Sequence, residues 1–257
     1  MSLFLGLDSS TQSLTAIVLD TANGQIVREL AINFGQDLPQ FNSPNGFLPH
    51  ANPLVKHSDP LMWVAALELV MDRLKAQGVP LAQIRGISGS GQQHGSVYLK
   101  TGLSEVTWRS DVSLVDQLRP LLSRATAPIW MDSATTAECQ EIAEDLGGDE
   151  EVSRISGSRT IERFTGPQIR RFYKEDPKGY AATGRIHMVS SFVASLLIGG
   201  DAPIDFGDGA GMNLLDLAKG EWHGQLLAAT APGLAAKLPP VKPGATQAGT
   251  IAAHFVS

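Results

Sequence analysis

The sequence predicts an α/β fold in which a mixed sheet carries helices on both faces. Three short apolar segments open the chain at residues 3–8, 14–20 and 25–34, and polar turns separate them. Their lengths and their alternation are typical of strands, and Asn23-Gly24 before the third segment is a common hairpin turn. Segments with helical and strand periodicity alternate along the rest of the chain, which indicates a mixed sheet rather than a purely antiparallel one.

A loop and a long helix are expected after this three-stranded opening. Residues 37–57 are rich in proline, asparagine and glycine, which favours a loop. Ser58 or Asp59 is suited to the N-cap of the helix, and Pro60 to its first turn. Apolar residues then recur on one helical face until Gly78, which predicts the end of the helix.

The remaining elements are expected in alternation. Short strands are predicted at residues 84–88, 96–99 and 128–131, and extended segments at 203–206 and 212–215. Helices are predicted at 114–123, 134–146 and 187–198. Ser133 is a suitable N-cap for the second of these helices, and the last two end at paired glycines.

Composition and charge exclude several classes of protein. The 257 residues include Lys+Arg 20 and Asp+Glu 26, a net charge of −6, which argues against general nucleic-acid binding. Cys139 is the single cysteine, so no intrachain disulfide or zinc-finger spacing is expected. No apolar run is long enough to span a bilayer, and no signal peptide is recognised. The sequence therefore predicts a cytoplasmic protein that binds neither membrane nor nucleic acid.

The first turn carries an unusual density of polar side chains. Between the first two predicted strands the chain reads Asp-Ser-Ser-Thr-Gln-Ser, from Asp8 onward. Hydroxyl groups and free backbone N–H groups suit phosphate oxygens, and one carboxylate suits a Mg²⁺ ion that keeps most of its waters. An ordinary solvated turn is the alternative, since these residue types are common in turns. The chain has no GxxxxGK[ST] loop, so any use of ATP would rely on another phosphate site.

A second polar loop, SGSGQQHGS at residues 88–96, follows a predicted strand. Glycines permit close approach of a ligand, and glutamine and histidine supply directional hydrogen bonds of the kind that a polyhydroxy substrate needs. The glycine spacing is GxGxxxG, which does not fit a dinucleotide-binding fingerprint. A glycine-rich loop whose histidine bonds only to backbone groups is the alternative.

Three further segments hold side chains that suit either a site or the scaffold. Asp132 follows a predicted strand at a helix start, where it could cap the helix or face a ligand. Glu162 and Arg163 could form a solvated ion pair, or the arginine could bind hydroxyl or phosphate groups. Asp205 and Asp208 lie in a glycine-rich stretch and could face a metal-bound nucleotide or only shape a loop.

Six segments, taken together and in order, resemble one protein family. They are GLDSSTQS, SGSGQQHGS, PIWMDSATTAEC, GSRTIERFTGPQIRRFY, VSSFVAS and PIDFGDGAGMNLL. They resemble the FGGY carbohydrate kinases, and within that family the xylulose kinases, over nearly the whole chain. The resemblance implies a ribonuclease-H-like fold, also called the actin-like ATPase fold. It also implies an enzyme that uses ATP and Mg²⁺ to convert D-xylulose to D-xylulose 5-phosphate.

The same resemblance implies a role for particular residues. The ketose would contact His94, Gln93 and Arg163. The phosphates of ATP would lie against Asp8, Ser10, Thr11 and Gln12, with Asp8 also at the metal. Asp132 and Asp208 lie in matching motifs without an equally clear role.

The family pattern also implies that residues 1–257 form an N-terminal, sugar-binding half. The family's general base is an aspartate in a Gly-Asp-Asn motif that this chain does not reach, so no catalytic base is assigned here and the nucleotide-binding half is expected elsewhere. Because a positioned base contributes typically about 10²–10⁴-fold in rate, we expect weak sugar binding and negligible kinase activity from the 257 residues alone.

The alternatives are a kinase of this family for another ketose or polyol, and a non-catalytic sugar-binding module. An apolar face that a second half would cover could also drive self-association, which makes a homodimer compatible with the sequence.

Overall fold

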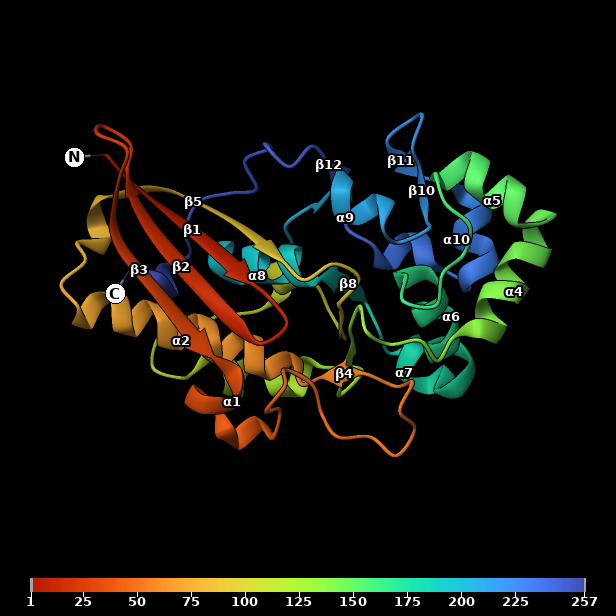
Figure 1. Cartoon of the computed structure of the whole chain (residues 1–257), viewed down its shortest axis with the longest axis horizontal. Coiled ribbons are helices and arrows are strands. Elements are labelled where there is room, and N and C mark those ends of the chain that lie inside the picture. Colours follow the sequence, from red (N-terminus) through yellow and green to blue (C-terminus); the bar gives the residue numbers. More distant parts are fainter. Residues whose placement is uncertain (1, 257) are drawn as a thin grey trace.

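The computed structural model describes residues 2–256 and joins the first three predicted strands in a four-stranded mixed sheet (Figure 1). Its order is β3-β2-β1-β5, formed by Gln25–Asn33, Ser13–Asp20, Leu3–Ser9 and Ile84–Gly91. β1 and β2 are antiparallel, as are β2 and β3, whereas β1 and β5 are parallel. The predicted α/β class with a mixed sheet is confirmed.

One face of this sheet forms the floor of the larger core. Along β1 the leucines at positions 3, 5 and 7 are buried, and the residues between them are exposed, including Phe4 at 39%. Helices α2 (Pro60–Ala76) and α8 (Val189–Ile198) share a single core with the buried face. At β1 the expected helices therefore cover one face rather than both, because its strict alternation leaves every second side chain in solvent.

Helix α2 begins and ends where the sequence predicts. The Asp59 carboxylate accepts a hydrogen bond from the backbone N–H of Leu61, and Pro60 occupies the first turn. Gly78 adopts a φ of +76°, the left-handed conformation that closes many helices. The other elements near this core are α1 (Phe34–Asp37), β4 (His57–Ser58), α3 (Leu114–Leu118), β7 (Ala127–Pro128) and the short 3₁₀ helices at Pro39–Phe41, Leu81–Gln83, Leu103–Glu105 and Arg119–Leu121.

A second, mainly helical half packs around its own core, at the right of Figure 1. Strand β8 (Arg185–Met188) pairs with β6 (Ser96–Leu99) and contributes to this core. The helices of this half are α4 (Thr136–Leu146), α5 (Asp149–Ser156), α6 (Thr165–Glu175), α7 (Pro177–Ala181), α9 (Phe206–Ala210) and α10 (Gly224–Thr230). Short pieces complete the chain: β9 (Ile204–Asp205), β10 (Leu215–Asp216), β11 (Glu221–Trp222), β12 (Val241–Lys242), and 3₁₀ helices at Leu234–Lys237 and Ala253–Phe255.

Several predicted boundaries were wrong. The strand expected at 128–131 is reduced to Ala127–Pro128, and Trp130 and Met131 are exposed rather than buried. Ser133 does not cap α4, because the helix begins at Thr136 and Thr135 occupies its N-cap position.

Three other segments also differ from expectation. The helix expected at 187–198 begins at Val189, since His187 belongs to β8. The helix expected at 114–123 gives way to a 3₁₀ turn after Leu118. The extended segment expected at 203–206 already turns into α9 at Phe206. Within residues 2–256, no helix combines the length and apolarity that crossing a bilayer requires.

Candidate functional site

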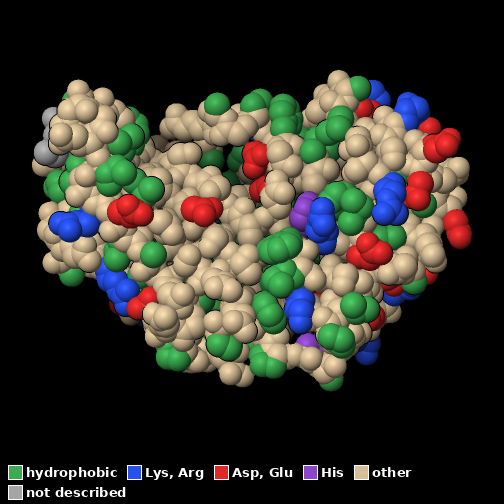
Figure 2. Space-filling view, viewed as in Figure 1, with side chains coloured by type: hydrophobic (Ala, Val, Ile, Leu, Met, Phe, Trp, Pro, Cys, Tyr) green, Lys and Arg blue, Asp and Glu red, His purple; other side chains and the backbone are tan. Residues whose placement is uncertain are grey.

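A polar cavity of about 500 Å³ lies where β1 and β5 end, and we call it the polar cavity. Nine residues line it: Asp8, Ser10, Thr11, Gly91, Gln92, Gln93, His94, Trp130 and Arg163. They come from the first turn, the loop after β5, the segment before α4 and the segment before α6. Figure 2 shows the face hollowed between the two halves, with acidic side chains beside the hollow. Asp8 and His94 therefore line the same cavity.

The two strand ends meet here because β1 and β5 are parallel neighbours. Asp8 stands opposite Ser90 in the register, and the Ser90 hydroxyl donates a 2.6 Å hydrogen bond to the Asp8 carboxylate. Parallel strands bring their carboxyl ends to one edge of the sheet, where ligands of α/β proteins commonly bind. The sheet topology therefore explains why two polar loops about 80 residues apart in sequence line the same cavity.

The first turn presents groups that fit a phosphate and a hydrated cation. The backbone N–H and the hydroxyl of Ser10 both bond to the Ser13 carbonyl, which fixes the turn. Asp8 is exposed, so most of its carboxylate lone pairs remain free. No cluster of three His, Cys, Asp or Glu ligands occurs among residues 2–256. A lone carboxylate fits Mg²⁺, which keeps several waters and takes the rest of its ligands from phosphates.

Trp130 closes the cavity beside this turn. Its indole Nε1–H donates a 2.9 Å hydrogen bond to the Thr11 hydroxyl, 119 residues away in sequence. The ring itself remains 44% exposed. Gln12 lies in the same turn, but its side chain is exposed outside the cavity lining, and its carbonyl accepts from the Phe34 N–H.

His94 is held in a defined tautomer. Its Nδ1 lies 2.9 Å from the Gly211 carbonyl, and a carbonyl can only accept, so Nδ1 carries the proton. Burial lowers the pKa of His94, and the Arg163 charge adds to this effect, although the Gly211 carbonyl acts in the opposite sense. The neutral ring therefore offers its Nε2 as an acceptor, which suits a sugar hydroxyl.

Close packing supports this orientation of the imidazole. The ring lies 4.8 Å, between centroids, from that of Phe164. His94 has a φ of +66°, a sparsely populated conformation for a residue with a side chain and one that is often found at functional sites. A Cβ on Gly211 would lie 2.8 Å from His94 Cε1, so a residue larger than glycine would displace the imidazole ring.

Gln92 presents a buried amide without a partner to the polar cavity. The residue is only 8% exposed and lines the cavity, yet neither its side-chain nitrogen nor its oxygen has a hydrogen-bond partner within residues 2–256. A buried amide without partners costs about 1–3 kcal/mol, and a bound molecule that hydrogen-bonds to it would remove this cost. Its neighbour Gln93 is exposed and also lines the cavity.

Arg163 completes the lining from the helical half. Its guanidinium lies 5.8 Å from the Phe164 ring centroid, and the residue is exposed. The alternative of a solvated pair with Glu162 is not favoured, because no ion pair joins the two residues in the described part of the chain. Glu162 Oε1 instead accepts a hydrogen bond from Thr136.

Asp132 lies outside the cavity lining and organises the scaffold behind it. The carboxylate is fully buried and accepts from the N–H groups of Lys56 and Ala134 and from the Gln168 amide. Burial alone would raise the pKa of Asp132, but the His57 ring, 3.4 Å away, and these donors lower it to about 2. The carboxylate thus ties the segment that carries Trp130 to helix α6.

Asp208 also lies behind the cavity. Its carboxylate accepts a short hydrogen bond from Ser190, and burial together with the nearby Asp205 raises its pKa to about 6. A Cβ on Gly91 would lie 2.7 Å from the Ser190 backbone nitrogen, so Ser190, which bonds to Asp208, packs against the Gly91 wall of the cavity.

Sequence reasoning did not select Gln92, Trp130 or Gly211 as site residues. Gln92 stands beside the selected Gln93, and no periodic signal separates two adjacent glutamines in a loop. Trp130 was expected in a buried strand, and its contact with Thr11 spans too much sequence for a local pattern to reveal.

The fold is that of an α/β domain of the ribonuclease-H-like kind, with a polar cavity at the strand ends. A "xyloylose kinase" from Brucella ovis has a TM-score of 0.78 at 22% identity, over 98% of this chain and 45% of that one. A Plasmodium falciparum glycerol kinase has a TM-score of 0.74 at 15% identity, over 100% of this chain and 46% of that one. At such identities the likeness shows the fold alone.

Sequence comparison shows the family. The N-terminal domain of the FGGY family of carbohydrate kinases matches residues 3–256. "Xylulose kinase 2" of Arabidopsis thaliana is 46% identical over 99% of this chain, and "Xylulose kinase" of Mus musculus is 41% identical over 98%. The chain belongs to the FGGY family of carbohydrate kinases. It spans about half the length of these relatives, 46% of each.

Proposed function

We propose that residues 1–257 form the sugar-binding, N-terminal half of an ATP-dependent kinase that converts D-xylulose to D-xylulose 5-phosphate. The observation that carries the proposal is the polar cavity, in which acceptors and donors for a polyol face a hydroxyl-rich turn suited to phosphate. The similarity to proteins described as xylulose kinases supports the choice of sugar.

The ketose side of the proposal rests on three kinds of group. His94 Nε2 would accept a hydrogen bond from one hydroxyl, and the unpartnered Gln92 amide would both donate and accept. Arg163 and Gln93 would bind further oxygens from the open side of the cavity. A site with buried polar groups rejects a sugar that lacks the matching hydroxyl by as much as roughly 10⁴–10⁵-fold, because those groups are then left unpaired.

The phosphate side rests on the first turn. Asp8 would hold Mg²⁺ through water or directly, and Ser10 and Thr11 would face the phosphates of ATP. When bound, the ion supplies positive charge against the phosphate oxygens. Trp130 keeps the Thr11 hydroxyl in place through its hydrogen bond. Gln12 belongs to the proposed set at the rim of the turn, although its side chain stands outside the lining.

The proposal assigns the general base to none of the residues 1–257. We propose that it comes from a C-terminal half together with the rest of the nucleotide site, and that residues 1–257 alone bind sugar weakly and turn over negligibly. The proposal places the enzyme in the cytoplasm, where ATP is available and where a buried free thiol such as Cys139 stays reduced. The exposed apolar side chains Phe4, Ile26 and Val27 support self-association as a homodimer in the absence of a covering domain.

A comparison of three sugars tests the proposed substrate. D-Xylulose, its C3 epimer D-ribulose and the polyol xylitol are titrated calorimetrically into the 257-residue chain, and all three are assayed as acceptors with the full-length protein. We expect D-xylulose to bind best and to be the preferred acceptor. Preference for ribulose or xylitol would support another kinase of the family, and ketose binding without any phosphorylation by the full-length protein would support a binding module.

A further inference from the structure

Helix α9 carries one of the contacts that orient His94. The helix and the residue after it read Phe-Gly-Asp-Gly-Ala-Gly, from Phe206 to Gly211, and the Gly211 carbonyl accepts the hydrogen bond from His94 Nδ1. Glycine destabilises a helix by about 1 kcal/mol relative to alanine, and an isolated helix of this length is not stable in water. The position of the Gly211 carbonyl therefore depends on the contacts that hold α9 from outside.

Two carboxylates hold α9. Asp205 is its N-cap and accepts hydrogen bonds from the backbone N–H groups of Gly207 and Asp208. Asp208 is only 8% exposed, and its carboxylate accepts a hydrogen bond from the hydroxyl of Ser190 in the first turn of α8. The first contact stabilises the helix itself, whereas the second attaches the helix to a neighbouring element.

The contact between Asp208 and Ser190 has a defined direction at neutral pH. Burial raises the pKa of Asp208 to about 6, against the opposing effect of the Ser190 hydroxyl, and the Asp205 carboxylate adds to the increase. At pH 7.5 the Asp208 carboxylate is therefore mostly ionised and can only accept, so the hydroxyl donates. Because a buried carboxylate is costly without a donor, we expect the two side chains to stay together.

The Asp208–Ser190 and Gly211–His94 contacts join the same two parts of the molecule. Ser190 lies in α8, which packs in the larger core, and His94 follows β5 of the main sheet. Asp208 and Gly211 both belong to the α9 segment of the helical half, less than one helical turn apart. A shift of α9 at Asp208 would therefore also move the Gly211 carbonyl.

We propose that Asp208 is a positioning residue for the sugar site: through Ser190 it holds α9 so that the Gly211 carbonyl keeps Nδ1 of His94 protonated. The neutral ring then presents Nε2 as an acceptor in the polar cavity. The identity of the ligand as a ketose rests on the proposed function, whereas the four contacting residues and their order do not depend on it.

Loss of the Asp208 contact should loosen α9 without unfolding the domain. Ile204 and Met212, which lie on either side of α9, are fully buried in the second core. They anchor the segment at both ends, so that only the residues between them gain freedom. Substitutions at Asp208 and Ser190 are therefore suitable tests of the proposal.

Nitrogen-15 spectra of the histidine rings in the ligand-free 257-residue chain test the positioning without any sugar. At pH 7.5 His94 should show a protonated Nδ1 and an unprotonated Nε2, and its signals are identified by their absence from His94→Gln. In Asp208→Ala and in Ser190→Ala the signals should move toward the mixture of tautomers that an imidazole without a fixed partner shows. Unmoved His94 signals in both variants would overturn the proposal.

Calorimetric titration of the full-length protein with D-xylulose measures the consequence for binding. Asp208→Ala and Ser190→Ala should each lower the affinity about tenfold, and the double variant should lower it no further, because both changes remove one contact. Asp208→Asn keeps an acceptor for the hydroxyl and should retain most of the affinity. Additive losses, or an equal loss in Asp208→Asn and Asp208→Ala, would refute the role of the contact.

Asp20→Ala is the matched control. Asp20 is 5% exposed, accepts hydrogen bonds from the backbone N–H groups of Ser2 and Ala22, and ends β2 away from the polar cavity. The His94 signals and the D-xylulose affinity should not change in this variant. Changes as large as those in Asp208→Ala would indicate general loosening of the fold and contradict a positioning role.

The two readouts separate this inference from the proposed function. Shifted His94 signals in the variants, together with no D-xylulose binding by the unchanged protein, would support the positioning role and refute the proposed substrate. Unshifted signals, together with equal D-xylulose binding by the unchanged protein and the variants, would support the substrate and refute the positioning role.

Discussion

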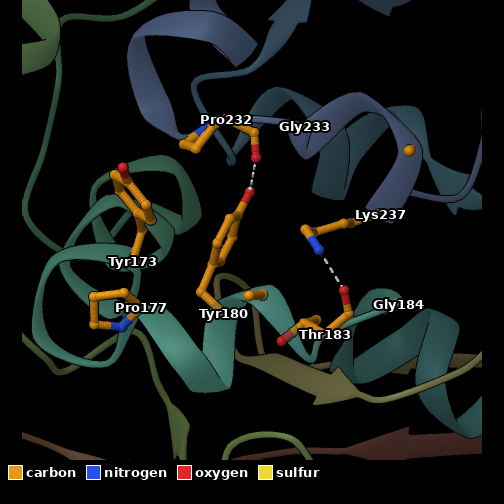
Figure 3. Close-up of a pocket in the computed structure, with 10 residues that line it drawn as sticks. Tyr173, Pro177, Tyr180, Thr183, Gly184, Pro232, Gly233 and Lys237 are labelled. Carbon is orange, nitrogen blue, oxygen red and sulfur yellow. Dashed lines mark hydrogen bonds between the residues drawn. The ribbon is translucent and has the colours of Figure 1, made fainter.

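The polar cavity differs in its lining from a second cavity of about 360 Å³ in the helical half (Figure 3), which we call the tyrosine cavity after Tyr173 and Tyr180. The polar cavity gathers residues from four separate segments at the ends of parallel strands, and its lining includes an unpartnered amide, an oriented imidazole and an exposed carboxylate. The tyrosine cavity is lined by the ends of α6, α7 and a 3₁₀ helix, with fixed rings and one cation. The contrast shows that in this molecule strand ends gather polar side chains around a cavity, whereas helix packing leaves mostly apolar walls.

Helix α6 connects the two cavities. Arg163 and Phe164 precede its first residue at the polar cavity, and Tyr173 lies near its other end at the tyrosine cavity. Its 11 residues, at about 1.5 Å per residue, separate the ends by roughly 16 Å. A substitution at one cavity therefore lies about a helix length from the other cavity, so the effects of the two substitutions can be measured separately.

The largest expected effect belongs to Asp8. Asp8→Asn in the full-length protein should lower kcat by at least about 10²-fold, the scale of losing one group that stabilises transition-state charge. D-Xylulose affinity should change little, because the ketose is assigned to the other side of the cavity. Steady-state kinetics and calorimetry check the two quantities. Asp72→Asn, on the exposed face of α2, is the control, and near-normal kcat in Asp8→Asn would contradict the assigned role.

The second largest expected effect is a loss of stability when Asp132, which joins the wall of the polar cavity to α6, is replaced. Asp132→Asn should lower the free energy of unfolding at pH 7 by about 2–4 kcal/mol, since an amide cannot accept all the hydrogen bonds that the carboxylate receives. Urea unfolding checks this, with exposed Glu150→Gln as the control.

The pH dependence of the Asp132 effect has a definite sign. The folded-state pKa of about 2 lies below the ordinary 3.8, so the charged form stabilises the fold above pH 3.8 by about 2 kcal/mol. That contribution is lost as the pH falls from 3.8 through 2. The difference in free energy of unfolding between the unchanged protein and Asp132→Asn should therefore decrease across this range. A difference that stays constant down to pH 2 would disagree with the lowered pKa.

A smaller effect is expected from Gly211. In Gly211→Ala the new Cβ would lie 2.8 Å from Cε1 and 3.1 Å from Nδ1 of His94, so the ring must move out of its place. D-Xylulose affinity should fall about tenfold, about 1.4 kcal/mol, with little loss of stability. Calorimetry measures the affinity. Gly224→Ala is the matched control because a Cβ added there would meet no heavy atom within 4 Å, and equal affinities in both variants would remove His94 from the ketose site.

The smallest expected effect is a pH dependence of D-xylulose binding in the polar cavity. Because the pKa of His94 is lowered from 6.5, the ring stays neutral and keeps Nε2 as an acceptor at pH 6.5 and above. D-Xylulose affinity should be constant from pH 8 to about 6.5 and fall below it. The folded state should also lose stability there, since it resists protonation of this histidine. Titrations in His94→Gln should lack the acid decline, and a change in affinity between pH 8 and 7 would conflict with a neutral His94.

Local pattern was sufficient for much of the fold. Strict alternation in β1 and β2 defined their buried face, and Asp59 with Pro60 marked the start of α2. Helices α5 and α6 were not predicted, since α6 opens with Thr-Gly-Pro and carries many charged residues. Proline in a first turn removes no intrahelical hydrogen bond, so packing of Ile169 and Phe172 in the second core stabilises a helix that propensity does not favour.

The sequence by itself determined the mixed α/β class, the family, and the two polar loops around Asp8 and His94, because these depend on local periodicity and on contiguous motifs. The tertiary structure alone decided which polar groups line a cavity and which are already hydrogen-bonded. Asp132 and Gln92 are both buried, but four polar contacts satisfy the first and none satisfies the second within the described chain. The physical reason is that hydrogen-bond partners come from segments distant in sequence, which a pattern of neighbouring residues does not reveal.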